Sequence, residues 1–555
     1  MLKALGALSC LAVPGRTASV HAASPAELPN ADYCAANGAS RKLFVPVGDG
    51  RFGRLPLDGA RLTMRASALS GNASPWTHGF TVEHRRARFI NPTLVCKRGD
   101  RVRIELENAL REPTIVHWHG LAVDTRNDGA AVPPVAPGKR YSYAFEVRDR
   151  GALYWYHPHP HGLTAGQAYR GMFGLIEVED DDERALRAAL DLVPGRSEIP
   201  LILQDRRGAN YSAAEPDRIH GWLGDDIHVN GAVCPHLDVA TRIYRFRVLN
   251  ASNARTFRLG FRGPDGTSMA FTLIGTDAGL LSAPRRCDEA FLATAERIDI
   301  LVDLSDASAG DTVLLETRAF DPMHMEMAGP AAAIDHAAMG HGATDQAATG
   351  HGAMDHGASP AADAQPGAAM DHAAMGHGGS LPEGVPRTLL QLRVRERIAY
   401  RAIIPQRLSS IVPFDATGAA ERPLRLGFAK GRWRINDRVF AMGETPIEVK
   451  RDSVETWLIR NYFTSMPHAM HLHGFHFQVI ERQTSPEQIR ALTVDDRGRL
   501  ATDLGWKDTV MVWPGESVKI GVDFALPFAG PQTYMLHCHN LEHEDGGMML
   551  GVKVG

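Results

Sequence analysis

The sequence lacks a strong excess of either charge, and it lacks any long apolar run that could cross a bilayer. Its 555 residues include 60 Lys and Arg against 64 Asp and Glu, for a formal net charge of −4. Nucleic-acid binding needs a clustered basic surface, so this balance argues against nucleic acid as a partner. Beyond a short apolar run at residues 4–13, no segment reaches the roughly 20 apolar residues of a transmembrane helix, so no membrane span is expected.

Cysteine is scarce, with six in the chain. Cys10 lies in an N-terminal segment that we expect to be removed, and Cys538 is interpreted below as a metal ligand. The other four can form up to two disulfides, but spacing does not determine the pairing, and buried free thiols are the alternative. These four are Cys34, Cys96, Cys234 and Cys287.

The N-terminus combines one basic residue, Lys3, with a short apolar run over residues 4–13 and a small-residue end at Ala22 and Ala23. This pattern predicts a secretory signal peptide over residues 1–23, and therefore a periplasmic or secreted protein. No twin-arginine pair precedes the apolar run, so we expect either the general export route or a start further upstream.

Histidine and methionine are abundant, at 25 and 18 residues, and both are ligands for soft or borderline metals. The key stretch is His537-Cys538-His539, followed by His543 and Met548. A blue-copper site needs one thiolate, two imidazoles and a weak thioether, and this stretch supplies three of the four ligands. Neighbouring side chains on an extended chain face opposite ways, so Cys538 should point away from its two flanking histidines.

Three further histidine pairs have one-residue spacing, which places both imidazoles on the same face of a strand. They are His117 and His119, His157 and His159, and His471 and His473. His468 lies three residues before His471, an odd offset, so it should face the opposite way, as Cys538 does. One face then collects His468, Cys538, His543 and Met548. The other face, together with the first-half pairs, supplies eight imidazoles, enough to hold three copper ions.

The chain is predicted to be all-β, with three strand-rich domains over residues 40–180, 196–320 and 386–555. Apolar and polar residues alternate in stretches such as 102–106, and turn residues recur every eight to twelve positions, which is typical of β-sandwiches or barrels. A charged helical connector is expected from about Asp181 to Leu192. The middle domain has no histidine pair and is expected to hold the other two together; His220, His228 and His236 are interpreted as ordinary surface or loop residues.

Residues 321–385 differ in composition, being mostly Ala, Gly, Asp, His and Met. Such a segment cannot build a core and is predicted to be a disordered Met/His-rich insert. The octet DHAAMGHG at 335–342 recurs at 371–378, and Met323, Met325 and Met327 open the segment. Thioether and imidazole ligands together suit Cu(I), so copper capture is the functional interpretation and a flexible linker is the alternative.

The four motifs, in this order, resemble those of the three-domain multicopper oxidases, the laccase and cuprous oxidase superfamily, and the insert resembles those of bacterial copper-tolerance oxidases. The resemblance implies three cupredoxin-like Greek-key β-sandwich domains and four copper ions. It implies type 1 ligands His468, Cys538, His543 and Met548, and type 2 ligands His117 and His471. It implies type 3 ligands His119, His157, His159, His473, His537 and His539.

The same resemblance implies two proton-relay acids and one substrate ligand. Asp128 matches an acid near the type 2 copper, and Glu544 matches an acid near the type 3 pair. Met466 matches a methionine that binds substrate copper, and Met323, Met325 and Met327 are further candidates. The chain departs from the family pattern at Thr464, where copper-tolerance oxidases carry an aspartate, so a substrate-copper site would have to be built differently here.

The function expected from this resemblance is one-electron oxidation of a donor, foremost Cu(I) in copper detoxification, coupled to four-electron reduction of dioxygen to water. A laccase-like oxidase of phenols and aromatic amines is the second hypothesis, since the copper core is common to both. An axial Met548 rather than Leu or Phe implies a lower potential for such substrates. A non-catalytic copper-sequestering protein is the third hypothesis. Copper storage, however, does not need a thiolate ligand that connects two metal sites.

Overall fold

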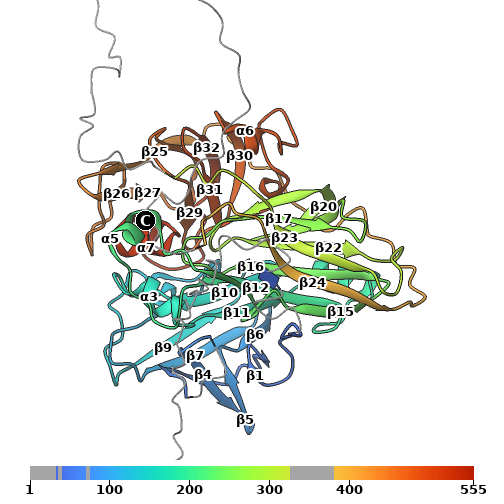
Figure 1. The fold of residues 1–555 in the computed structure, drawn as a ribbon. Coiled ribbons are helices and arrows are strands. Elements are labelled where there is room, and N and C mark those ends of the chain that lie inside the picture. The colour runs from blue at the N-terminus through green and yellow to red at the C-terminus, as the bar shows by residue number, and fades with distance from the viewer. Residues whose placement is uncertain (1–32, 35–40, 71–74, 325–380) are drawn as a thin grey trace, which may run out of the picture.

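A computed structural model describes residues 33–34, 41–70, 75–324 and 381–555, which form three β-sandwiches (Figure 1). The predicted all-β class with three sandwich domains is confirmed. The signal peptide predicted over residues 1–23 and most of the Met/His-rich insert lie outside the described residues. Within the described part of the chain, no helix combines the length and apolar character needed to cross a membrane.

The first domain packs two sheets against each other around a core that includes Met64, Phe80, Ile104 and Ile176. Strand β7 (Arg101–Asn108) buries every second residue, as its alternating sequence predicts. The first sheet has the strand order β1 (Gly50–Arg51), β5 (Ala87–Ile90), β4 (His78–His84), β3 (Leu62–Ala68), β7 and β9 (Arg140–Glu146). The second has the order β2 (Arg54–Pro56), β6 (Thr93–Lys97), β11 (Gly174–Glu179), β10 (Ala152–Pro158) and β8 (Val116–His117).

The second domain is built in the same way, and helix α4 (Asp181–Ala189) connects it to the first, as expected. One sheet has the order β14 (Ala232–Val233), β13 (Asp226–Val229), β12 (Glu198–Arg206), β16 (Ile243–Asn250), β22 (Arg297–Asp303), β19 (Phe271–Thr276) and β20 (Gly279–Cys287). The other has the order β15 (His236–Ala240), β24 (Arg387–Glu396), β23 (Thr312–Thr317), β17 (Phe257–Arg262) and β18 (Ser268–Met269), with β21 (Glu289–Leu292) also paired to β17.

Strand β24 corrects the expected start of the third domain at residue 386. This strand pairs antiparallel with β23 and parallel with β15, so it completes the second domain. Both partners precede the Met/His-rich insert, and local alternation cannot reveal which sheet a strand joins. The insert therefore interrupts the second domain between two paired strands instead of linking two domains.

The third domain carries one sheet with the order β26 (Arg432–Ile435), β25 (Ala420–Ala429), β28 (Val454–Asn461), β32 (Ser517–Asp523) and β30 (Phe477–Gln483). Its second sheet has the order β27 (Ile447–Val449), β34 (Met549–Val554), β33 (Gln532–Cys538), β29 (His468–Leu472) and β31 (Thr509–Val512). Strands β29 and β33 lie side by side, with Met470 opposite Cys538 and His471 opposite His537. The two metal-ligand motifs of this domain are thus neighbours.

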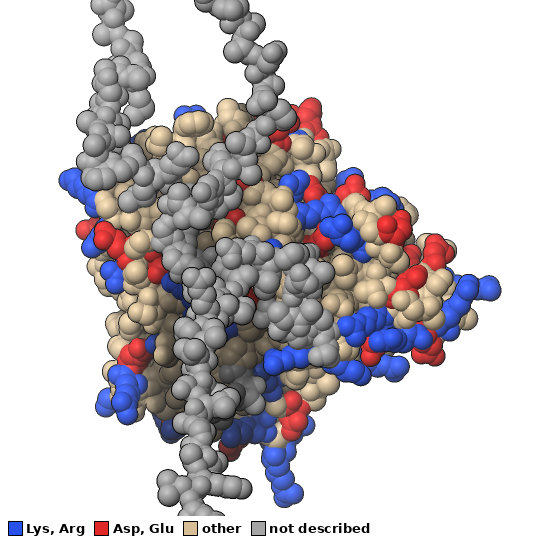
Figure 2. Space-filling view, in the orientation of Figure 1, with Lys and Arg blue, Asp and Glu red and all other residues tan. Residues whose placement is uncertain are grey.

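Short helices lie where the domains meet: α3 (Thr164–Tyr169) and α5 (Glu215–His220) both contact α7 (Leu541–Asp545) (Figure 1). The remaining helical turns are α2 (Thr125–Asp128), α6 (Glu487–Arg490) and the 3₁₀ turn η3 (Ala501–Asp503). Cys34 and Cys234 form a disulfide, while Cys96 and Cys287 are free thiols, so one of the two possible disulfides forms among the described residues. On the face shown in Figure 2, acidic and basic side chains are interspersed over the second domain.

A buried ion cluster joins α4 to the sheet of the second domain. Arg245 is fully buried and contacts Glu183 at 2.6 Å, Glu198 at 3.0 Å and also Asp299. Burial alone would raise the pKa of Glu183, but the charges of Arg245 and Arg247 outweigh it and lower that pKa to about 2.

The depressed pKa of Glu183 predicts a loss of stability in acid. A lowered folded-state pKa contributes stability above the usual value near 4.5, and this stability is lost as pH falls towards 2. The melting temperature should therefore fall between about pH 5 and pH 3. Glu183→Gln should lower the melting temperature at pH 7 and reduce the decrease in melting temperature between about pH 5 and pH 3. If the melting temperatures of the variant and the wild type decreased in parallel with pH, Glu183 would not be the group responsible.

Candidate metal centre

Eight histidine side chains from the first and third domains converge in one buried cluster between them. His117 ends β8 and lies opposite His157 of β10, and His471 of β29 lies opposite His537 of β33. The other four follow these strands by one or two residues: His119, His159, His473 and His539. All eight rings are buried. The structure thus brings together all four histidine pairs found in the sequence.

Glycine follows His119 and His473 because a side chain would collide at both positions. Gly120 has φ +86°, and a Cβ atom there would lie 2.6 Å from Oδ2 of Asp508. Gly474 has φ +72°, and its Cβ would run into the ring of Tyr534. Glycine permits both the left-handed turn and the close approach, which directs each His-x-His pair into the cluster.

The hydrogen bonds of His117 and His471 determine which ring nitrogens carry protons. His117 Nδ1 lies 2.9 Å from the carbonyl oxygen of Asp128, and His471 Nδ1 lies 2.8 Å from that of Asp508. A carbonyl oxygen only accepts, so each Nδ1 donates a proton. Both Nε2 atoms therefore present lone pairs, yet they face each other at 3.5 Å.

Other histidines of the cluster also place Nδ1 against an oxygen atom and turn Nε2 towards another histidine. His473 Nδ1 lies 2.9 Å from Oδ2 of Asp128, and His537 Nδ1 lies 3.1 Å from the carbonyl oxygen of Cys538, while their Nε2 atoms are 3.0 Å apart. His157 Nδ1 lies 2.9 Å from the carbonyl oxygen of Pro158, and its Nε2 lies 3.4 Å from Nδ1 of His119. His539 Nε2 also points at His157 Nε2, at 3.4 Å.

Facing lone pairs in a buried site are unfavourable unless a cation lies between them. Burial lowers the pKa of His119, His471 and His473 well below the usual value, which keeps these rings neutral and available as ligands. Nε2 of His159 has no hydrogen-bond partner among the described atoms. The donor set therefore fits metal ions, and three histidine trios each gather ligand atoms within 4.8 Å: His117, His471 and His473; His117, His119 and His157; and His159, His473 and His537.

A second donor set lies on the other side of Cys538. Its Sγ atom is 3.5 Å from Nδ1 of His468 and 3.6 Å from Nδ1 of His543. His543 donates through Nε2 to the carbonyl oxygen of Ile219 at 2.8 Å, so its Nδ1 presents a lone pair to the sulfur. Met548 is buried in the same core cluster. Burial raises the pKa of Cys538 to about 12, and a bound cation would displace its proton.

The two predicted acids both contact the histidine cluster. Asp128 ends α2 and holds His473 through Oδ2, and its Oδ1 has no hydrogen-bond partner among the described atoms. Glu544 lies on α7, with its carboxylate 3.3 Å from Nδ1 of His537 and 3.5 Å from Nε2 of His159. Burial, with the charge of Asp545 as a smaller cause, raises the pKa of Glu544 well above its usual range. A neutral carboxyl group can donate a proton into the cluster.

A third acid, Asp508, was not predicted. Its Oδ1 lies 3.1 Å from Nε2 of His119, and its carboxylate is held by Arg297 at 2.6 Å. Burial would raise its pKa, but Arg297 outweighs burial and lowers it well below the usual value. Arg297 begins β22 of the second domain, so that domain helps to orient the cluster.

A surface cavity of about 750 Å³ reaches the second donor set and has His543 in its wall. Trp433 also lines it and packs against both imidazoles, with ring centroids 4.6 Å from His468 and 5.2 Å from His543. Tyr211 lines it too. An electron donor in this cavity would lie against the ring of His543.

The candidate substrate-copper methionines do not form one site among the described residues. Met466 is buried in the core cluster that contains Cys538. Met323 packs instead against the cluster of Phe291 and Trp513. Met325 and Met327 lie outside the described residues. None of the described residues that line the cavity beside His543 is a methionine.

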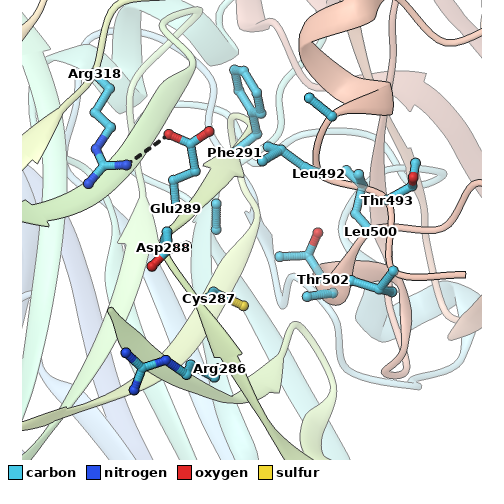
Figure 3. Close-up of a pocket in the computed structure, with 14 residues that line it drawn as sticks. Arg286, Cys287, Asp288, Glu289, Phe291, Arg318, Leu492, Thr493, Leu500 and Thr502 are labelled. Atoms are coloured by element: carbon cyan, nitrogen blue, oxygen red, sulfur yellow. Dashed lines mark hydrogen bonds and ion pairs between the residues drawn. The ribbon is translucent and has the colours of Figure 1, made fainter. Parts of the chain in front are cut away.

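Another cavity, of about 470 Å³, lies between the second and third domains (Figure 3). Cys287 lines it, but burial raises the pKa of this thiol to about 11, so it is protonated at neutral pH. Glu289 is paired with Arg318 at 3.0 Å. The described residues that line this cavity include no histidine or methionine, and we assign the cavity no part in metal binding.

Comparison with known proteins agrees with this geometry. Residues 81–183 and 415–555 each match a family model described as multicopper oxidase. Bilirubin oxidase from Albifimbria verrucaria is 30% identical over 465 residues, which cover 82% of this chain and 70% of that protein. Multicopper oxidase mco from Staphylococcus aureus is 28% identical over 472 residues, covering 84% and 82%.

The crystal structure of the McoA multicopper oxidase from Aquifex aeolicus has a TM-score of 0.74 and 32% identity to this chain, and covers 93% of this chain and 99% of its own. The likeness therefore spans all three domains. The chain belongs to the multicopper oxidase family, a family of oxidoreductases with copper cofactors.

Proposed function

We propose that the protein couples one-electron oxidation of a donor beside His543 to four-electron reduction of dioxygen to water. The observation that carries this proposal is the position of Cys538, whose sulfur faces His468 and His543 while its chain neighbours His537 and His539 enter the eight-histidine cluster. The two donor sets are thus joined by a few covalent bonds. Bound copper would take electrons singly at the sulfur and pass four of them to dioxygen at the histidine cluster.

The proposed ligand assignment uses one type 1, one type 2 and two type 3 ions. Cys538, His468, His543 and Met548 would hold the first, and the convergence of the sulfur with two imidazoles supports this. His117 and His471 would hold the type 2 ion through their facing Nε2 atoms. The six remaining rings would hold the type 3 pair: His119, His157, His159, His473, His537 and His539.

Dioxygen reduction consumes protons, and two buried acids, Glu544 and Asp128, are placed to relay them. Glu544 contacts His537 and His159, on the side of the type 3 ligands. Asp128 contacts His473 and, through its backbone, His117, on the side of the type 2 ligands. In the proposed reaction each acid delivers protons to its own side of the cluster.

Cu(I) is the donor that we favour, in a role in copper detoxification. The Met/His-rich insert suits Cu(I) capture, and its two ends meet near His543, where His324 pairs with Glu383 at 2.6 Å. An exported, periplasmic or secreted location fits this role. The Cys34–Cys234 disulfide supports it, because disulfides persist mainly in oxidising compartments.

An aromatic donor is the second candidate, as in a laccase-like oxidase. The cavity beside His543 is lined by Trp433 and Tyr211, and its described wall holds no methionine. Flat aromatic walls suit phenols and aromatic amines better than a metal ion.

Oxygen uptake by the copper-loaded protein distinguishes the two donors. We expect Cu(I) to support a higher kcat/KM than 2,6-dimethoxyphenol. Replacing residues 325–380 by a Gly/Ser linker should lower kcat/KM for Cu(I) and leave that for the phenol unchanged or higher. Faster turnover of the phenol, together with Cu(I) oxidation that survives the replacement, would favour the laccase-like function instead.

A further inference from the structure

His119 is held by the opposite ring nitrogen from most of its neighbours in the histidine cluster. Five rings, those of His117, His157, His471, His473 and His537, place Nδ1 against an oxygen atom. In His119 it is Nε2 that lies against an oxygen, Oδ1 of Asp508, at 3.1 Å. An ionised carboxylate only accepts, so Nε2 carries the proton of the neutral ring and Nδ1 holds the lone pair. That Nδ1 faces Nε2 of His157 at 3.4 Å.

Two parallel hydrogen bonds hold the carboxylate of Asp508 in this orientation. Nη1 of Arg297 donates to Oδ1 at 2.9 Å, and Nη2 donates to Oδ2 at 2.6 Å. The hydroxyl of Thr509 also donates to Oδ1, at 2.9 Å. A two-pronged arginine–carboxylate pair fixes the plane of the carboxylate as well as its position. Oδ1 therefore cannot turn away from His119 without breaking these hydrogen bonds.

Arg297 belongs to the second domain, and its guanidinium group reaches the other two. Nε donates to the carbonyl oxygen of Leu153 in β10 of the first domain at 3.2 Å, while Nη1 and Nη2 hold Asp508 of the third domain. Within its own domain, the carbonyl oxygen of Asp277 accepts from Nη2 at 2.9 Å. Arg297, Asp277 and Asp508 are almost completely buried. A single side chain thus joins all three domains next to the cluster.

A second buried cation strengthens the contact between the second and third domains. Lys507 precedes Asp508, and its Nζ lies 3.2 Å from Oδ2 of Asp277 and 3.1 Å from Oε1 of Glu296. Both carboxylates belong to the second domain. Buried charges are costly unless they are paired, so these groups favour the docked arrangement of the two domains. Docking in turn places Asp508 beside His119.

The group formed by His119, His471 and Asp508 is better suited to orienting rings than to holding a metal ion, although its ligand atoms gather within 4.8 Å. His119 directs its N–H group at the carboxylate, and His471 directs its N–H group at the carbonyl oxygen of Asp508 at 2.8 Å. Arg297 already supplies the positive charge. A cation there would meet two N–H groups and a guanidinium group.

We propose that Asp508 and Arg297 are positioning residues that keep Nδ1 of His119 directed at its copper ion. The second domain, which contributes none of the proposed ligands, controls the cluster through Arg297. This inference rests on the proposed assignment of copper to the eight-histidine cluster. Among the described residues, neither Asp508 nor Arg297 forms a hydrogen bond or ion pair with a ligand of the second donor set, so copper at Cys538 should not depend on them.

Copper retention tests the proposal without turnover. Copper-loaded full chains are equilibrated with increasing concentrations of a copper chelator, and total copper and the visible band of thiolate-bound copper are measured together. Asp508→Asn keeps the size of the side chain and removes the charge that holds the proton on Nε2. The affinity for the cluster ions should fall about 10–100-fold, while the visible band persists. Arg297→Gln should behave alike, and Arg297→Lys, which keeps the charge, should show a smaller fall.

The matched control is Arg255→Gln, which removes another buried arginine of the second domain, paired with Asp205 at 2.8 Å. This variant should lose thermal stability but keep the wild-type affinity for the cluster ions. An equal loss of cluster copper in the control would reduce the effect to general destabilisation and overturn the positioning role.

Thr509→Val removes one donor to Oδ1 at almost constant size and supplies the test if Asp508→Asn does not fold. It should weaken copper binding by the cluster by a smaller factor, again with the visible band intact. Unchanged cluster affinity in the folded variants, in a wild-type background that binds cluster copper, would overturn the positioning role and leave the proposed function standing. A wild-type chain whose cluster binds no copper would overturn both.

Discussion

Replacing Cys538 by serine is expected to abolish oxygen uptake with both Cu(I) and phenol. The sulfur is the one atom that faces His468 and His543 while its own backbone continues into His537 and His539. A serine oxygen is a hard, weakly acidic ligand and cannot replace a thiolate at a copper site of this kind. The visible band near about 600 nm, which comes from thiolate-to-copper charge transfer, should disappear with activity.

The histidine cluster should survive this substitution, because none of its contacts passes through the sulfur. The variant should therefore keep about three coppers per chain and lose one. Cys287→Ser is the matched control, since Cys287 is a free thiol on β20 and should keep both the colour and the turnover of wild type. A Cys538→Ser protein that remains blue would contradict the assignment of the sulfur.

Replacing Glu544 by glutamine has the second largest expected effect. The carboxyl group is buried, with its oxygens 3.3 Å from Nδ1 of His537 and 3.5 Å from Nε2 of His159. Glutamine keeps its size but cannot deliver a proton, so kcat for oxygen reduction should fall by about 10²–10⁴-fold. Electron uptake at Cys538 needs no proton from Glu544, so anaerobic bleaching of the blue band by the donor should keep its wild-type rate.

Stopped-flow absorption separates these two steps. Slow reoxidation by dioxygen after normal bleaching would support proton delivery by Glu544. Equal slowing of bleaching and reoxidation would instead indicate that the substitution disturbs the whole site. Glu487→Gln, at an exposed position of helix α6, controls for the loss of one carboxylate elsewhere.

The metal-ligand motifs were predictable because they depend on local geometry. Alternation along β29 and β33 separates Cys538 and His468 from their neighbours, and no knowledge of the fold is needed to see it. Asp508 gave no such signal. It meets His119 from 389 positions away, and its orientation depends on Arg297 of another domain. A contact of that kind is created by domain packing and leaves no spacing pattern in the sequence.

The boundary error at β24 and the interpretation of His220 as a surface or loop residue have the same cause, since His220 is in fact buried at the end of α5. Alternation shows that residues 387–396 form a strand but not that their partner is β23, on the other side of the insert. His220 looked like a scattered loop residue because its neighbour His324 is about a hundred positions away. Local pattern identifies elements and ligand types, whereas the partners of isolated residues follow from tertiary contacts.

The most direct test of the central claim is anomalous X-ray scattering at the copper edge from crystals of the copper-loaded protein. The account predicts one copper peak at Cys538 between His468 and His543, and three more between the facing nitrogens of the eight-histidine cluster, about four in all. A cluster without copper, or copper bound away from Cys538, would contradict it.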